Sequence, residues 1–250
     1  MTFDKSLTVR EIAIQNPASV RLFEDLGIDY CCGGKRSLEE ACQVANVPVE
    51  PVVEQLTALE AGAASADEMP WMAARLCDLT AFIVDRHHAF VRSEIPRIDA
   101  LLQKVVSRHG AAHAELKPIQ ENFTALSEEL LAHMMKEEHV LFPFIQQMEE
   151  AQRKNRPAPA GCFPSVQFPI ARMLADHDDA GALLARLKQL SNGYQAPPDA
   201  CPSYRGLYHA LAEFERDLHQ HVHLENNVLF PRAVHMERVL QGEANVPQHV

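Results

Sequence analysis

A histidine and a glutamate stand four residues apart at two places in the chain, within closely similar sequences. The first is HMMKEEHVLFP at 133–143, and the second, HVHLENNVLFP at 221–231, follows 88 residues later. Residues four apart lie on one face of an α-helix, so each pair points an imidazole and a carboxylate the same way. One such pair is common on charged helix surfaces, whereas a repeated pair indicates a shared metal site. The two pairs are His133 with Glu137 and His221 with Glu225.

The same repeat predicts two further ligands on the intervening helices. Moving ARMLADHDDAGALL back by about 89 residues places His177 upon His88. In antiparallel neighbours, two residues lie level when they are equally far from the turn that joins their helices. The midpoints between successive histidines fall at 110–111, at 155 and at 199, and all three lie in predicted connections. The four imidazoles can therefore meet at one level of a helical bundle.

The chemistry that these residue types suit is the binding of two metal ions. Four imidazoles and two carboxylates are too many ligands for one tetrahedral zinc ion. Each of two ions would take two histidines, and both glutamates could bridge. Two-metal sites in helical bundles typically hold iron or manganese, and this nitrogen-rich set favours iron. Six protein ligands over two ions leave positions for a small molecule such as oxygen, water or nitric oxide. The predicted ligands are His88, His133, Glu137, His177, His221 and Glu225.

Other polar residues near the repeat have less defined roles. His219 and His223, four residues apart, could in principle hold zinc, but two solvated histidines on an outer face are the simpler interpretation. Glu138 directly follows a predicted ligand, and the sequence leaves open whether it supports the ligands or is merely exposed. A metal site of purely structural function is the remaining alternative.

Two adjacent cysteines, Cys31 and Cys32, precede a Gly-Gly pair in DYCCGG. One interpretation is two small buried residues. An exposed reactive pair explains neighbouring thiols at a glycine turn better, and it could bind or pass on iron or take part in thiol exchange. A disulfide between adjacent cysteines would be strained and therefore easily reversed.

The elements that must position these residues are helices. Residues 1–62 predict a small helical domain in which Gly27 ends one helix and a capping box begins the next at Ser37. The stretch AGAASADEMP at 61–70 is predicted to be a linker. Four long segments with helical periodicity follow, and strand signals are nearly absent. We therefore predict an all-α fold, with an antiparallel four-helix bundle over residues 71–250.

Composition argues against several classes of function. The chain of 250 residues has a formal net charge of −11, which disfavours a nucleic-acid surface and docking on anionic lipid. No run of about 18 apolar residues occurs, and the start MTFDKSLTVREIA lacks the features of a signal peptide. Six cysteines in this length do not make a disulfide scaffold and indicate a reducing compartment. We expect a soluble, acidic protein from a reducing compartment that binds neither nucleic acid nor membrane.

The motifs together resemble a known family. The predicted ligand set on four helices resembles the hemerythrin-like fold, and LGIDYCCGGKRSLEEAC at 26–42 resembles the conserved-cysteine domain of the iron–sulfur cluster repair di-iron proteins. That family, also called repair of iron centres, joins the two domains, and the resemblance covers essentially the whole chain. It implies a non-haem di-iron centre bridged by both glutamates, with or without a bridging oxygen atom. It also implies restoration of clusters damaged by oxidative or nitrosative stress, a cytoplasmic location, and a homodimer as one compatible assembly.

The sequence departs from the oxygen-carrying hemerythrins at two positions. Those proteins have a further histidine on the third helix and an aspartate on the fourth. Here Gly181 and Asn226 stand at these places. The site therefore has fewer protein ligands, which disfavours reversible carriage of oxygen.

Three functions are compatible with such a site. The leading hypothesis is a protein that supplies labile iron to damaged or apo iron–sulfur proteins. The second is reduction of nitric oxide at the diferrous site, for which a partner would have to deliver electrons because the chain has no flavin or haem motif. The third is oxygen or redox sensing by a binding module.

Overall fold

The computed structural model describes residues 4–31, 33–61 and 71–242, and in these residues the regular structure is helical. An isolated bridge between Thr8 and Ser37 is the β-type pairing found there. The predicted all-α fold class is confirmed. Apart from its first residue, the predicted linker at 61–70 lies outside the described residues, as does Cys32. No helix in the described ranges has the length and apolar character needed to cross a membrane.

Short helices with well-formed caps make up the amino-terminal part. They are α1 (Val9–Gln15), α2 (Ala18–Leu26), α3 (Leu38–Val44) and α4 (Val49–Ala61). Ser37 begins α3 with the predicted capping box, because its side chain accepts from the Glu40 backbone while the Glu40 carboxylate accepts from the Ser37 N–H. Gly27 ends α2 in the left-handed region, at φ 68°, where glycine carries no strain. Both sequence predictions are confirmed.

The four predicted long segments form helical rods, and three of these rods contain a π-helical segment. The first rod is α5 (Leu76–Phe82), η1 (Ile83–His88) and α6 (Ala89–His109). The second is α7 (Leu116–Lys136), η2 (Glu137–Leu141) and α8 (Phe142–Arg153). The third is α9 (Gln167–Leu190), and the fourth is α10 (Pro202–His223), η3 (Leu224–Leu229) and α11 (Phe230–Leu240). A π-helical turn bonds residue i to residue i+5, is rare, and is often found at functional sites.

The chain divides into two compact units that do not follow the order of the sequence. One unit comprises Met1–Leu79, Met148–Ala158 and Gln220–Val250. The other comprises Thr80–Gln147 and Pro159–His219. The domain limits expected from the sequence, 1–62 and 71–250, stay a prediction.

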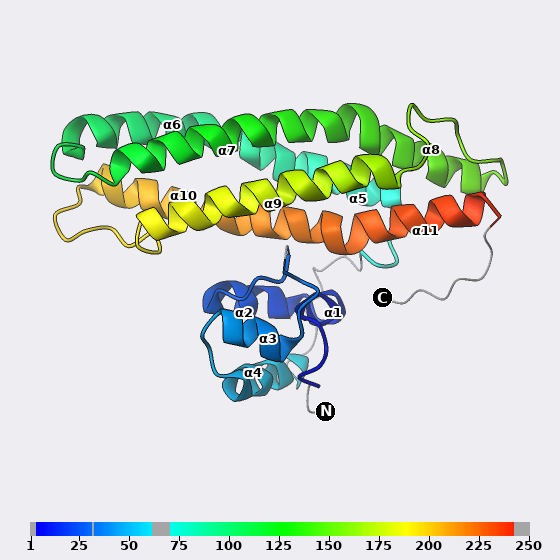
Figure 1. The fold of residues 1–250 in the computed structure, drawn as a ribbon, viewed down its shortest axis with the longest axis horizontal. Coiled ribbons are helices and arrows are strands. Elements are labelled where there is room, and N and C mark those ends of the chain that lie inside the picture. Colours follow the sequence, from blue (N-terminus) through cyan, green and yellow to red (C-terminus); the bar gives the residue numbers. More distant parts are fainter. Residues whose placement is uncertain (1–3, 32, 62–70, 243–250) are drawn as a thin grey trace. The chain divides into compact units, whose positions relative to one another are not determined.

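Within the second unit, helices α6, α7, α9 and α10 lie alongside one another (Figure 1). Their facing sides carry apolar residues at helical spacing. The rings of Phe123 on α7 and Phe214 on α10 meet edge to face, with centroids 5.6 Å apart. Burial of each such side chain contributes about 1.5–3 kcal/mol. This packing fixes the rotation of the helices about their axes, and with it the direction of the histidines that they carry. The buried residues include Ile98, Leu102, Ile119, Phe123, Leu184 and Phe214.

Within the first unit, two side chains hold the start of α5. The Glu149 carboxylate on α8 accepts hydrogen bonds from the backbone N–H groups of Leu76, at 2.6 Å, and of the following residue, at 3.0 Å. It therefore satisfies N–H groups that a helix start leaves without an intrahelical acceptor, and it is favourable beside the helix dipole. Arg232 on α11 donates to the carbonyl oxygens of Trp71 and Ala74. These contacts fix the start of the rod that leads to His88.

An ion-paired histidine joins two connections in the second unit. The His113 Nδ1 lies 3.1 Å from Glu115, and its Nε2 lies 3.1 Å from Asp199 in the connection before α10. The hydrogen bond to Asp199 raises the pKa of His113 above its ordinary value of 6.5, against a smaller opposite effect of burial. Because the folded state holds this proton more tightly, the ion pairs stabilise the fold below pH 6.5. The stabilisation is lost as the pH rises through the raised pKa.

We expect a His113→Gln variant to lose this pH dependence. Between pH 6 and pH 9 the wild-type chain should lose at most about 1 kcal/mol of unfolding free energy relative to the variant, because partly exposed ion pairs are weak. Urea unfolding at both pH values measures the difference. The exposed His139 provides the control, through His139→Gln. Equal slopes for wild type and His113→Gln would contradict the prediction.

Candidate dimetal centre

The six predicted ligands come from all four rods, and each is buried. His88 is the last residue of η1, Glu137 is the first residue of η2, and Glu225 lies in η3. The other three lie on α-helical segments of the second, third and fourth rods. Each of the six residues is at most 3% exposed. They are His88, His133, Glu137, His177, His221 and Glu225.

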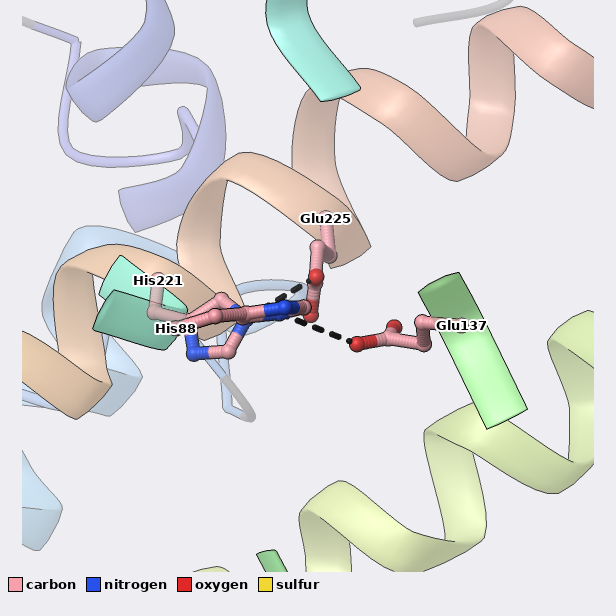
Figure 2. Close-up of side chains that lie close together, drawn as sticks. All are labelled: His88, Glu137, His221 and Glu225. Carbon is pink, nitrogen blue, oxygen red and sulfur yellow. Dashed lines mark hydrogen bonds and ion pairs between the residues drawn. The ribbon is translucent and has the colours of Figure 1, made fainter. Parts of the chain in front are cut away.

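The structure brings these residues into two groups of four that share both glutamates. One group contains His88 and His221, and the other contains His133 and His177. In each group, one ligand atom from every residue lies within 4.8 Å of the others. Figure 2 shows the first group, with both imidazoles and both carboxylates turned toward one another. First-row metal ions bind nitrogen and oxygen at about 2 Å, so ligands on opposite sides of an ion lie about 4 Å apart. Each group has the size of one metal site.

His88 is oriented by a carboxylate on each side of its ring. Its Nε2 lies 3.4 Å from Glu137 Oε2, and its Nδ1 lies 2.6 Å from Glu138 Oε1. The Glu138 oxygen also accepts a hydrogen bond from Arg92 at 2.6 Å. Since a carboxylate accepts, the ring proton belongs on Nδ1, and Nε2 presents its lone pair toward Glu137. This is the tautomer that binds a metal through Nε2.

His133 has the same arrangement with a different outer carboxylate. Its Nε2 lies 3.3 Å from Glu137 Oε2 and 3.1 Å from the Nε2 of His177. Its Nδ1 lies 3.4 Å from Asp176 Oδ2, and Lys136 donates to that carboxylate at 2.8 Å. A carboxylate behind the ring again places the proton on Nδ1 and directs the Nε2 lone pair inward.

Electron-pair donors therefore face one another at the centre of the site. The inward nitrogens of His88 and His133 both approach the Glu137 carboxylate, which is an acceptor as well. Such a contact is repulsive unless a cation lies between the atoms. Neutral imidazoles and carboxylates at this spacing are ligands that iron and manganese accept. The residues present thus fit two metal ions, for which Glu137 and Glu225 would be the shared ligands.

The outer carboxylates are kept ionised by basic neighbours. Burial alone would raise the pKa of Glu138, but its hydrogen bonds to Arg92 and His88 lower the pKa below its ordinary value. Burial would also raise the pKa of Asp176, and there Lys136 and His133 lower it. Both groups therefore remain hydrogen-bond acceptors for the ring N–H behind the site.

Glu138 is the outer residue whose loss we expect to weaken metal binding most clearly. A Glu138→Gln variant keeps the shape of the side chain but places an amide against His88, so the preferred tautomer and the basicity of the ring change. Loss of such a partner typically costs about 10–100-fold in metal affinity. Competition with a metal chelator measures the affinity, and Glu128→Gln, an exposed carboxylate on α7, is the control. An affinity within twofold of the control would refute this role.

The two outer carboxylates mark the limit of what the sequence alone indicates. Glu138 was left open, and Asp176 was not identified. Each directly adjoins a predicted ligand in the sequence, which is the signal that could have singled them out. Each contacts a histidine on a neighbouring rod, however, and that pairing emerges only when the rods are packed.

His223 does not match the expectation of two solvated histidines at 219 and 223. It is 7% exposed, and its ring meets Tyr30 edge to face with centroids 5.3 Å apart. Burial lowers the pKa of His223 to about 4, against a smaller raising effect from a hydrogen bond with the Tyr30 backbone. The prediction was wrong because it considered the α10 surface without the segment that covers it. His219 is more exposed and lies 4.0 Å from Glu215.

Cys31 also differs from its expected setting. The sequence predicted an exposed thiol pair, but Cys31 is only 5% exposed. Its thiol donates to Asp29 Oδ1 at 3.3 Å, and its backbone N–H donates to the same oxygen at 3.1 Å. The expectation of exposure is therefore wrong for Cys31. Cys32 lies outside the described residues, and a role of the two thiols in iron transfer stays a prediction.

Comparison with known proteins relates this geometry to a family. The hemerythrin HHE cation binding domain matches residues 79–233, and the ScdA_N domain, a domain of unknown function, matches residues 5–60. A protein of Pectobacterium atrosepticum is 37% identical over 91% of this chain and 96% of its own length. A protein of Musicola paradisiaca is 37% identical over 94% of this chain and 96% of its own length. A protein of Yersinia pseudotuberculosis is 35% identical over 90% of this chain and 96% of its own length.

Each of these three relatives is named iron-sulfur cluster repair protein YtfE. The matched hemerythrin segment contains all six residues that the structure gathers into the two ligand groups. The match to the amino-terminal domain contains the cysteine motif. The chain therefore belongs to the YtfE-like iron–sulfur cluster repair proteins, which join an ScdA_N domain to a hemerythrin HHE domain.

Proposed function

We propose that this chain holds two iron ions and helps to repair iron–sulfur clusters damaged by oxidative or nitrosative stress. The observation that carries the proposal is the pair of buried ligand groups that share Glu137 and Glu225. The role for which the relatives are named supports the biological setting, since they match this chain over nearly their whole length. The nitrogen-rich ligand set favours iron as the metal.

The ligand set is suited to releasing iron as well as binding it. Two ferrous ions carry four positive charges, while the two glutamates supply two negative charges and the four imidazoles are neutral. Six protein ligands also leave coordination positions for other molecules, so the centre is less enclosed than a structural metal site. When bound, iron supplies Lewis-acid and redox chemistry. The chain's own residues hold the ions, exclude bulk water and keep the histidines in the binding tautomer.

Within this function we propose that the chain donates iron to apo or damaged iron–sulfur proteins. In this proposal iron is the cargo, and the shared carboxylates are the groups that let it go. A carboxylate can bind one ion or bridge two, so one ion can leave while Glu137 and Glu225 still hold the other. The buried setting keeps the cargo away from solvent until a client protein approaches.

Iron transfer to an apo-[4Fe–4S] enzyme tests this proposal. The iron-loaded chain, sulfide and a thiol reductant are mixed without oxygen, and recovery of the enzyme's activity is followed together with the iron left on the chain. We expect recovery to match the loss of iron from the chain, and to exceed recovery with an equal amount of chelated iron. The Glu137→Leu chain carried through the same loading serves as control. No recovery above the chelated-iron level would refute donation.

Reduction of nitric oxide is the rival function, favoured by the open coordination positions that six ligands for two ions leave. It requires electrons from a partner. Anaerobic mixing of the diferrous chain with nitric oxide separates the two functions. Nitrous oxide formed without loss of iron would favour catalysis, whereas loss of iron without nitrous oxide would favour donation. A reversible oxygen adduct would instead indicate a sensing role.

A further inference from the structure

The two copies of the repeated motif differ on one face. Met135 and His139 in the first copy correspond to His223 and Asn227 in the second, at the same offset of 88 residues as the ligands. Met135 is 58% exposed and His139 is exposed as well. His223 and Asn227 are only 7% and 5% exposed. The ligand positions are thus alike in both copies, while this second face is solvated in one copy and covered in the other.

The residue that covers this face in the second copy is Tyr30, in the same compact unit as the segment after Gln220. Asn227 Nδ2 donates to the carbonyl oxygen of Tyr30 at 3.1 Å and lies 2.8 Å from His223 Nδ1. The Tyr30 ring, 1% exposed, rests on the imidazole of His223. An amide NH2 has two donor hydrogens, so Asn227 can serve the carbonyl and the neutral imidazole together.

The peptide bond between Tyr30 and Cys31 is therefore held at both ends. Its carbonyl accepts from Asn227, and its N–H donates to Asp29 Oδ1 at 3.1 Å. The same Asp29 oxygen accepts from the Cys31 thiol. All these groups are buried or partly buried, where removing one partner of a hydrogen bond leaves the other unsatisfied and is therefore costly. The buried Cys31 thiol therefore shares its Asp29 acceptor with this peptide bond.

Asn227 is also close in sequence to a metal ligand. It lies two residues after Glu225 within η3, where backbone bonds run from residue i+5 to residue i, as from Phe230 to Glu225. Asn227 and His223 thus flank the ligand in the sequence, and both contact the residue before Cys31. Metal binding at Glu225 would order the same short segment that anchors the cysteine motif.

We propose that His223 and Asn227 are positioning residues that lock the peptide bond before Cys31 onto η3. Through this lock, iron at the centre and access to the Cys31 thiol are coupled, a step that rests on the proposed iron binding. Iron at Glu225 orders η3 and closes the lock, and loss of iron loosens it. Coupling of this kind is reciprocal, so opening of the cysteine motif lowers the affinity for iron. A typical coupling changes an equilibrium by about 5–150-fold.

Alkylation of Cys31 in the full-length protein tests the lock. Iodoacetamide labelling is timed with and without iron, and fragment mass spectrometry distinguishes Cys31 from Cys32. In the metal-free protein, Asn227→Asp keeps the side-chain shape but sets a carboxylate against the Tyr30 carbonyl. We expect it to raise the labelling rate of Cys31 at least about tenfold. His223→Phe keeps a ring against Tyr30 but loses the imidazole nitrogen, and should raise the rate several-fold.

Gln220→Leu is the matched control. Gln220 also contacts the amino-terminal helices, donating at 3.3 Å to the Glu24 oxygen that accepts from the Tyr30 hydroxyl, whereas the Tyr30 carbonyl accepts from Asn227. In the Gln220→Leu chain, the labelling rate of Cys31 should stay within twofold of the wild-type rate. If Gln220→Leu and Asn227→Asp raise labelling equally, the contact is general packing and no lock exists. Circular dichroism checks that each variant folds. If Asn227→Asp does not fold, the labelling rate of Cys31 in His223→Phe tests the lock in its place.

The coupling is read from the wild-type chain and needs no variant. We expect iron loading to slow Cys31 labelling at least about fivefold and to slow hydrogen exchange of the Cys31 amide. In Asn227→Asp the difference between loaded and metal-free protein should disappear. Unchanged labelling and exchange on loading of the wild type would overturn the coupling. If the wild-type chain does not bind iron, the proposed function is refuted instead. The labelling rates of Cys31 in the metal-free variants would still test the lock.

Discussion

A Glu137→Leu chain, loaded and purified without oxygen, should retain almost no iron, whereas a His177→Leu chain should retain about one ion. The difference arises because Glu137 belongs to both ligand groups and His177 to only one. Leucine has nearly the volume of glutamate but no donor atom, so it removes one ligand from each ion at once. His177→Leu leaves the group that contains His88 and His221 complete.

Elemental analysis of iron per chain measures this prediction. Two ions are expected for wild type and for Glu128→Leu, a control that replaces an exposed glutamate on the same rod as Glu137. Circular dichroism confirms that every variant remains helical. One firmly held ion in the wild type would show that only one group binds metal. Equal iron contents of Glu137→Leu and His177→Leu would show that the shared carboxylate does not bridge.

The convergence of the ligands could be predicted from the sequence because it depends on two periodicities. The helical repeat puts each His–Glu pair on one face, and the spacing of 88 residues repeats the pair on a second rod. Successive histidines are equally far in sequence from the connection that joins their helices, which places them at one level of the bundle. These features need no knowledge of individual contacts, and the structure does bring the six side chains together.

The π-helical segments were beyond the same reasoning. Segment η2 begins at Glu137 and η3 contains Glu225, so both occur at the repeated ligand, but α9 lacks such a segment at its histidine. No residue type in the repeat predicts a π-helical hydrogen bond from the backbone N–H of residue i+5 to the carbonyl oxygen of residue i. A π turn is unfavourable in an isolated helix and persists only where the surroundings over-determine it. Groups from other rods approach Glu137 and Glu225, and the local sequence does not contain them.

The covered face of the second copy was missed for a similar reason. From α10 alone, His223 points away from His221 and resembles a solvated residue. Its burial depends on Tyr30, nearly two hundred positions earlier in the chain. Cys31 was misjudged along with it, because the carbonyl before it is anchored by Asn227. Pairings between distant segments of this kind have no periodic signal.

Removal of the metal should destabilise the protein strongly, and Glu137→Gln should partly reverse that loss. Iron at about one thousand times its dissociation constant stabilises the folded chain by about 4 kcal/mol. For a chain of this size that corresponds to about 10 °C in melting temperature. The metal-free site brings two buried carboxylates into the same ligand groups, and like charges at such a distance repel. A glutamine at position 137 removes one of these charges and keeps the shape.

Thermal melts of loaded and chelator-treated chains measure both effects. We expect the metal-free Glu137→Gln chain to melt several degrees above the metal-free wild type, although it binds little iron. Glu128→Gln should follow the wild type in both states. A metal-free wild type that melts like the loaded protein would contradict the expectation. The predicted opposite effects on binding and on metal-free stability follow from one cause, because the carboxylates that attract two cations repel each other when those cations are gone.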